Sequence, residues 1–243
     1  MKFNTNSNVY IIIYSVVMVV IVAVLLSLAA LGLKPRQDEN ILNEKKTQIV
    51  KALGFDAATV TYDSVVAEAA LLNAEGAITE NDVQKVFAAL QDVKGSRDAG
   101  SFPIFKATDG SVVVPLYGAG LWGPIWGYVA LAPDMNTVKG IVLDHSGETP
   151  GLGAEITTAK HQAMYPGKTV FEGEELVGIT LKKGGADANN PHEVDAITGG
   201  TKTSDGVSAM IKDCLVSYVP YFVAVKATTE QVSNELNTEN NGK

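Results

Sequence analysis

Residues 195–204 read DAITGGTKTS and join an expected strand, Glu193–Ile197, to the most strongly predicted helix of the domain, Ser204–Phe222. Backbone N–H groups at a helix N-terminus have no partner within the helix and can bind phosphate, and paired glycines leave room for it. One interpretation of the stretch is therefore a phosphate site; the other is an ordinary N-cap at Thr203 or Ser204. The helix is predicted because apolar residues recur at helical spacing, at Val207, Met210, Ile211, Cys214, Leu215, Tyr218 and Phe222.

A glycine-rich loop upstream, GAGLWG at 118–123, matches the pattern G-x-G-x-x-G without its usual context. A dinucleotide-binding loop opens a helix, whereas Pro124 follows here and the next residues have the character of a strand. We therefore expect a tight connection between two strands. The apolar pair Leu121 and Trp122 on this loop could cover a flat ring.

A second glycine-rich loop, HSGETPGLG at 145–153, follows an expected strand and precedes an expected short helix. Its glycines allow the backbone to approach a ligand closely, while Glu148 offers an acceptor and Thr149 a hydroxyl. On chemistry alone, such a loop is more often a plain turn than a binding site.

The region around these loops has the pattern of an α+β domain. From about Phe102 the hydrophobic pattern alternates, with turns at 109–110 and 133–134, and a short helix is expected over Ala154–Tyr165. Because strands and helices do not alternate strictly, an antiparallel sheet is favoured over a doubly wound one. The other expected strands are Val112–Tyr117, Ile125–Ala132, Val138–Leu143 and Leu176–Leu181.

The N-terminal part contains an uncharged stretch, Val9–Leu33. At about 1.5 Å per residue, its roughly 25 residues exceed a hydrocarbon core of about 30 Å. A cleaved signal peptide is the alternative, but its apolar core would span only about 7–15 residues. We therefore expect one transmembrane helix. Lys2 on one side and Lys34 and Arg36 on the other encode its orientation only weakly.

Residues 36–95 are expected to be helical. Ile41–Leu53 has the pattern of a surface helix, and Thr79–Asp82 resembles a capping box before a helix that ends at Gly95. The tail from Ala227 is polar, and we expect it to be partly disordered.

Composition and charge argue against several function classes. A formal net charge of -8 gives no basis for binding nucleic acid, which needs clustered Lys and Arg. The single cysteine, Cys214, excludes an intrachain disulfide, an iron–sulfur centre and a Cys-rich zinc site. Three scattered histidines do not indicate a metal site. Any redox chemistry must therefore come from an organic cofactor.

Taken in order, the three loops resemble those of the FMN-binding domain family, as found in the C subunit of the Na+-translocating NADH:quinone reductase. The G subunit of the Rnf electron-transport complex shares the last two loops. The resemblance covers nearly the whole chain, and Gly120-Leu121-Trp122 followed by Gly127-Tyr128 is more similar to the quinone reductase subunit. It implies four parts: a transmembrane anchor (1–35), a helical membrane-proximal region (36–95), an FMN-binding domain (96–226) and a polar tail (227–243).

The resemblance also implies a covalent flavin. The family motif is D-x-x-[ST]-G-A-[ST], and FMN is joined through its phosphate to the last hydroxyl, which is Thr201 here. Asp195 is the leading acid, Thr198 the first hydroxyl, and Gly200 stands where alanine is usual. The other implied contacts are ring packing by Leu121, Trp122 and Leu152, polar contacts by Glu148 and Thr149, and Gly199, Gly200 and Thr203 near the phosphate.

The implied function is that of an electron-transfer subunit of a Na+-translocating NADH:quinone oxidoreductase, not catalytic alone, whose FMN is a one-electron relay. A negative Glu148 near the ring would disfavour a fully reduced anionic flavin and so favour one-electron behaviour. The implied partners are other subunits of the complex, a dedicated flavin transferase and the lipid bilayer, with the domain on the periplasmic face of a bacterial inner membrane. No NADH site is visible, so the electron donor and quinone sites are expected on other subunits. An Rnf-type subunit and a membrane-anchored FMN-binding module outside any complex remain alternatives.

Overall fold

The computed structural model describes residues 7–228. The chain divides into two compact units, Met1–Lys45 and Lys46–Lys243. The predicted polar tail, 227–243, lies outside the described residues except for 227 and 228, which are helical.

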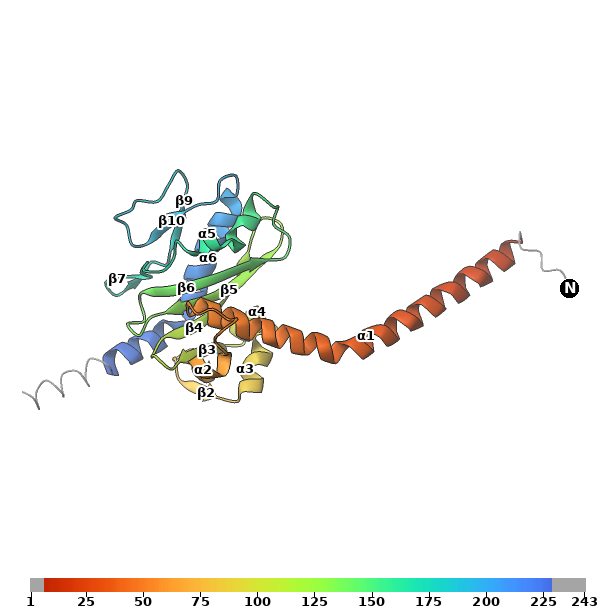
Figure 1. Ribbon diagram of the computed structural model, residues 1–243, viewed down its shortest axis with the longest axis horizontal. Helices are drawn as coiled ribbons and strands as arrows, with labels where there is room; N and C mark the ends of the chain where they lie inside the picture. The colour runs from red at the N-terminus through yellow and green to blue at the C-terminus, as the bar shows by residue number, and fades with distance from the viewer. Residues whose placement is uncertain (1–6, 229–243) are drawn as a thin grey trace, which may run out of the picture. The chain divides into compact units, whose positions relative to one another are not determined.

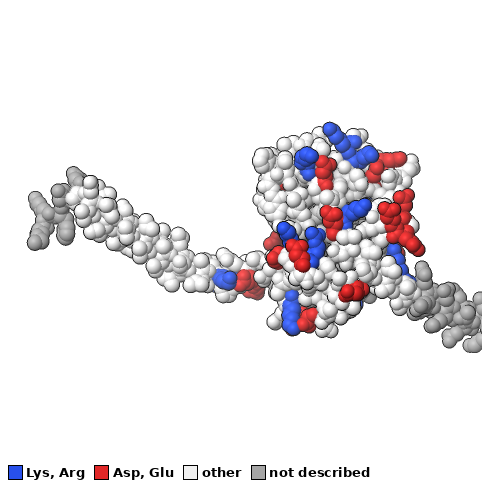
Figure 2. Space-filling view, turned by 180° about the vertical axis from the view of Figure 1, so that it is seen from behind, with Lys and Arg blue, Asp and Glu red and all other residues white. Residues whose placement is uncertain are grey.

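Helix α1 (Asn8–Ala52) contains the predicted transmembrane stretch. Residues 8–40 are exposed throughout, and the apolar outer part of this helix carries no acidic or basic group (Figure 2). The uncharged stretch of this helix is long enough to cross a membrane, and none of it is buried by other parts of residues 7–228. The helix includes Pro35 and continues through the predicted surface helix Ile41–Leu53 almost to its end.

The second unit is built on a six-stranded antiparallel sheet in the order β2-β1-β3-β4-β5-β6. β4 and β5 pair over their whole length, which places the 120–123 turn at one end of the sheet. The predicted antiparallel α+β architecture is therefore confirmed. The strands are β1 (Val66–Leu72), β2 (Ile78–Glu80), β3 (Phe102–Ala107), β4 (Val112–Ala119), β5 (Pro124–Leu131) and β6 (Val138–His145).

Helix α6 (Thr201–Leu215) packs against the sheet, and the main core lies between them (Figure 1). Its predicted apolar face is confirmed, because each of its members from Val207 to Phe222 is buried. The helical path continues through η2 (Val216–Tyr218) and residues 219–228. The smaller elements are α2 (Tyr62–Val65), α3 (Val83–Ala89), α4 (Val93–Asp98), η1 (Gly153–Thr157), α5 (Ala159–Gln162), β7 (Phe171–Glu172), β8 (Glu175–Leu176), β9 (Thr180–Lys182) and β10 (Glu193–Asp195).

The prediction that residues 36–95 are helical is wrong over residues 53–61, which connect α1 to α2, and over residues 66–80. The latter segment forms β1 and β2, and β1 pairs with β3 from one end to the other, so it belongs to the same sheet as the predicted domain. The sequence of β1, VAEAALL, is rich in helix-favouring alanine and leucine. Tertiary pairing with β3 overrides that propensity.

Several predicted boundaries also need correction. The N-cap of α3 is Asp82 rather than Thr79, and Gly95 lies inside α4 instead of ending a helix. The strand expected over Leu176–Leu181 is interrupted at Gly178, whose φ is 73°. The helix expected over Ala154–Tyr165 is divided into η1 and α5.

Candidate functional site

Three segments far apart in the sequence meet at one end of the sheet. They are the turn between β4 and β5, the loop that follows β6, and the start of α6. The Trp122 N–H donates to Glu148 Oε1 at 2.9 Å, and Thr203 Oγ1 donates to Glu148 Oε2 at 2.6 Å. The three segments singled out in the sequence therefore form one site, with Glu148 between the other two.

The Glu148 carboxylate joins the first loop to the start of α6, and we call this pair of hydrogen bonds the Glu148 bracket. Only 5% of the surface of Glu148 is exposed. Burial raises the pKa of its carboxyl, but hydrogen bonds from the Thr203 hydroxyl and from the N–H groups of Trp122 and Leu121 outweigh that effect. The net result is a pKa below the usual value, so Glu148 is anionic at neutral pH. Its backbone is held as well, since the Glu148 N–H donates to His145 Nδ1 at 3.2 Å.

Helix α6 begins three residues before the predicted start at Ser204, and its N-cap is Gly200. Glycine has no side chain with which to cap, so the first-turn amides have no side-chain acceptor from the N-cap residue. Thr201 is the first residue of the helix, and it is exposed. The site thus presents an exposed hydroxyl, which has no partner within residues 7–228, beside backbone N–H groups at the positive end of a 15-residue helix, and this arrangement suits a phosphate group.

The two hydroxyls considered as N-caps have other partners. Thr203 Oγ1 donates to Glu148, so this residue can offer a phosphate only its backbone N–H. Ser204 Oγ donates to the Gly200 carbonyl at 2.9 Å and accepts from the Ile197 N–H at 3.0 Å. Ser204 therefore closes the loop that leads into the helix.

An apolar rim surrounds the site. Leu121, Trp122 and Leu152 expose 54%, 69% and 42% of their surfaces. Exposed large apolar side chains beside polar groups are typical of a binding surface. Together with the start of α6, where the N-cap has no capping side chain, this rim fits a ligand that has a flat apolar ring and a phosphate, as FMN does. Thr149 is also exposed, in the same loop.

Leu152 packs against Gly199, and Ile197 packs against Gly200. Gly199 has a φ of 74°, and a Cβ added there would lie 2.6 Å from Leu152 Cδ2. A Cβ added at Gly200 would lie 2.9 Å from Ile197 Cγ2, so Ile197 occupies the space that the family's usual alanine methyl would need.

Replacing Gly199 with alanine should lower the free energy of unfolding by about 1–3 kcal/mol, because alanine is strained at this φ and would also displace Leu152. Gly151→Ala is the matched control: its φ is 75°, but an added Cβ meets nothing within 4 Å, so it reports the backbone strain alone. Urea unfolding of both variants measures the difference. Equal losses would contradict the packing of Leu152 on Gly199.

Two residues of the site were not among the predicted contacts. His145 accepts the Glu148 N–H, and Ser204 closes the loop before α6. His145 is the first residue of the second loop and Ser204 the last residue of the motif stretch, so their positions in the sequence could have indicated that they belong to the site. Their partners depend on the fold and carry no local signal.

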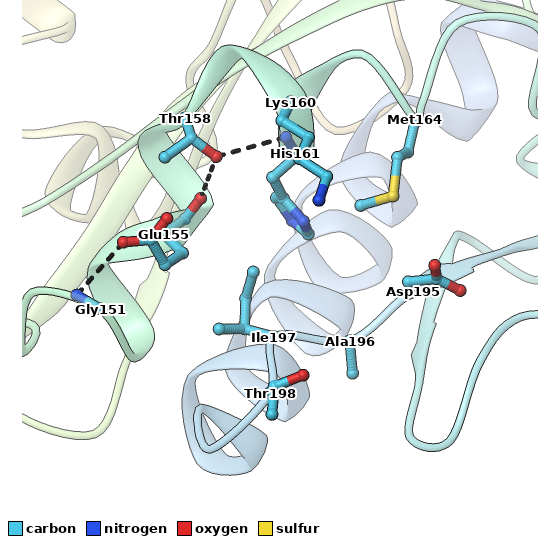
Figure 3. Close-up of a pocket in the computed structure, with 10 residues that line it drawn as sticks. All are labelled: Gly151, Glu155, Thr158, Lys160, His161, Met164, Asp195, Ala196, Ile197 and Thr198. Carbon is cyan, nitrogen blue, oxygen red and sulfur yellow. Dashed lines mark hydrogen bonds between the residues drawn. The ribbon is translucent and has the colours of Figure 1, made fainter.

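A cleft of about 400 Å³ lies beside the segment that leads to Thr201 (Figure 3). Residues 195–198 form one wall, and η1 and α5 form the other. Asp195, the leading acid of the motif, accepts the Ala186 N–H at 2.7 Å and so holds a neighbouring loop. His161 also lines the cleft: its Nε2 lies 3.0 Å from the Tyr165 hydroxyl, and its Nδ1 has no partner within residues 7–228.

His161 should make the domain sensitive to acid. Burial lowers its pKa from 6.5 to about 4, against an opposing effect of the Asp195 carboxylate. Between pH 6.5 and about pH 4, His161 of the unfolded chain binds a proton that the folded chain does not bind. The free energy of unfolding therefore decreases as the pH falls, by up to about 3 kcal/mol. Thermal unfolding of wild type and His161→Gln from pH 7 to 4 measures this component. Parallel curves for the two proteins would contradict it.

Comparison with known proteins places this site in a defined family. A family model described as "FMN-binding domain" matches residues 120–216, which include the second and third segments in full and residues 120–123 of the first. The chain is 32% identical to the C subunit of the Na(+)-translocating NADH-quinone reductase of Haemophilus ducreyi, over 93% of this chain and 98% of that protein. It is 40% identical to the same subunit of Pasteurella multocida, over 72% of this chain and 63% of that protein.

Solved structures agree with these matches. The crystal structure of the corresponding Na(+)-translocating NADH-quinone reductase subunit from Parabacteroides distasonis is 36% identical in sequence. It superposes with a TM-score of 0.71, over 78% of this chain and 96% of that one. The similarity therefore includes the fold of the domain as well as the motifs.

Proposed function

Because the chain belongs to the family of the C subunit of the Na(+)-translocating NADH-quinone reductase, we propose that it carries FMN within such a membrane complex and passes electrons through it. It is an electron-transfer subunit and is not an independent enzyme. The observation that carries the proposal is the start of α6, where an exposed threonine lies beside uncapped backbone N–H groups and an apolar rim.

FMN is attached through its phosphate to Thr201. Support comes from the exposure of Thr201 at the first position of α6, while the neighbouring hydroxyls of Thr203 and Ser204 are already engaged. A flavin transferase forms the ester, so the chain gains FMN less one water. Gly199 and Gly200 lie near the phosphate without side chains that would compete with it for the first-turn N–H groups, and the Thr203 N–H faces it from the same turn.

The ring lies against Leu121, Trp122 and Leu152, with Glu148 and Thr149 as polar neighbours. Bound FMN supplies one- and two-electron chemistry. The residues of this chain hold the ring in place, exclude water from one of its faces and set the charge around it. The NADH and quinone sites are on other subunits.

Glu148→Gln tests whether the charge of Glu148 tunes the flavin. Glutamine can accept the Trp122 N–H and donate to Thr203 Oγ1, so it keeps the bracket and removes only the charge. The loss of a nearby negative charge should raise the reduction potential of the flavin. It should also bring the potentials for the first and the second electron closer together. A redox titration of the variant complex measures both quantities. If neither changes, Glu148 has no electrostatic role at the ring.

The chain is anchored in a membrane through α1, whose apolar stretch is exposed along its length. We place the domain on the periplasmic face of a bacterial inner membrane, with the lipid bilayer around residues 9–33. The flavin transferase meets the domain at the exposed first turn of α6.

Copurification separates this function from that of an isolated FMN-binding module. Tagged full-length chain, solubilised from native membranes in mild detergent, should bring with it several polytopic subunits and NADH-dependent quinone reduction. Recovery of the flavinylated chain alone would instead favour a membrane-anchored module outside any complex.

A further inference from the structure

One edge of the main sheet is open beside β1. β3 pairs with β1 from Val66 to Leu72 on one side, whereas on the other side β2 pairs only with Leu71 and Leu72. The N-terminal half of β1, residues 66–70, therefore has no neighbouring strand on that side within residues 7–228.

The chain leaves this edge for a local reason. The Glu80 carboxylate accepts the N–H groups of Asn81 and Asp82, both at 3.2 Å. The Asp82 side chain in turn accepts the Gln84 N–H at 2.8 Å and caps α3. These bonds turn the backbone into a helix where a longer β2 would have continued along β1.

Within residues 7–228, the open edge leaves the buried backbone groups of Ala69 without partners. The Leu71 carbonyl accepts from Thr79 Oγ1, and just after β1 the Asn73 N–H donates to the Ala77 carbonyl, so both residues face the β2 side. Backbone groups of alternate residues in an antiparallel strand face the same neighbour, so the N–H and C=O of Ala69 face the vacant position. Ala69 is only 3% exposed, and buried backbone groups are nearly always hydrogen-bonded.

A groove of about 350 Å³ runs along this edge. Residues 66–69 form one side, Asn81 and Val83 form the other, and Tyr62 and Asp63 also line it. Tyr62 is 8% exposed, and its hydroxyl has no partner within the described residues. The ring of Tyr62 packs edge-on against Phe87 and Phe105, and its hydroxyl oxygen is buried.

We propose that this groove receives a short extended segment of another subunit of the membrane complex, which adds to the sheet as a strand beside β1. An added backbone supplies the donor and the acceptor that Ala69 lacks, and one of its carbonyls accepts the Tyr62 hydroxyl. A charged ligand fits less well, because Asp63 and Glu68 are already paired with Lys46 and Lys106. Other subunits are the partners that membership of this family provides. The proposal is independent of where the flavin is attached.

Amide hydrogen exchange tests the proposal on the wild-type protein. Exchange at Ala69 is compared between the isolated full-length chain and the intact complex, with the neighbouring Ala70, which faces β3, as the matched control. We expect exchange at Ala69 to slow by up to roughly tenfold in the complex, since one backbone hydrogen bond is worth at most about that factor, while Ala70 is unchanged. Equal exchange at Ala69 in both states would overturn the proposal. Protection already present in the isolated chain and lost on removal of residues 229–243 would also overturn it, because the chain's own tail would then fill the groove.

Photocrosslinking identifies the partner. A photoreactive phenylalanine analogue in place of Val83, on the rim of the groove, should form an adduct in the intact complex with one short segment of one other subunit. The absence of any adduct with another subunit at this position would contradict the proposal.

Discussion

A complex that carries Thr201→Ala should assemble normally but lose NADH-driven quinone reduction, to the level of a complex without this subunit's flavin. The substitution removes the only atom to which the phosphate could be esterified at this position. It should not unfold the domain, because Thr201 is exposed and its hydroxyl makes no hydrogen bond within residues 7–228. The measurement is quinone reduction by the purified complex, alongside flavin fluorescence of the separated subunit.

Two further variants show whether the loss is specific. Thr201→Ser keeps a hydroxyl at the same position and should retain both the flavin and activity. Thr157→Ala removes an exposed threonine in η1, outside the three loops of the site, and should also retain both. Full activity in the Thr201→Ala complex would show that electrons do not pass through a flavin at this residue.

Replacing Glu148 with alanine should produce the largest loss of stability at the site. It leaves the Trp122 N–H and the Thr203 hydroxyl without an acceptor where little water can reach them. Two hydrogen bonds to a charged group predict a loss of about 3 kcal/mol, or about 6–12 °C in Tm for a domain of this size. Calorimetry of the flavin-free protein measures this effect separately from redox function.

Glu148→Gln is the matched variant, because it can keep both hydrogen bonds. It should unfold within a few degrees of the wild type at neutral pH. The pKa of Glu148 in the folded protein lies below its ordinary value, so the stability that its charge contributes is present at neutral pH and is lost as the pH falls through that lowered pKa. A Glu148→Ala variant as stable as Glu148→Gln would show that the hydrogen bonds of Glu148 to Trp122 and Thr203 do not stabilise the domain.

The glycine-rich segments could be identified from the sequence because their chemistry is local. Paired glycines before a helix, and an apolar pair on a tight turn, indicate how the backbone can approach a ligand whatever surrounds them. The role of Glu148 could not be predicted in full, since it depends on Thr203, 55 residues further along the chain. The carboxylate expected to contact a ligand is also the group that holds the loops together.

The start of α6 shows how local preference can mislead. Threonine and serine are better N-caps than glycine in isolation, which favours a helix start at Thr203 or Ser204. In the fold, Glu148 and Ile197 engage those two hydroxyls, so the helix begins at Thr201 with Gly200 as its cap. The same long-range control explains β1, whose alanine-rich sequence becomes a strand because β3 pairs with it.

The most direct test of the central claim is the intact mass of the full-length protein purified from a host that contains its flavin transferase, measured beside Thr201→Ala. Thr201 as the attachment point predicts a wild-type mass increased by FMN less one water, a fragment spectrum that places the addition on Thr201, and an unmodified variant. An unmodified wild-type protein, or an addition that persists in Thr201→Ala, would contradict it.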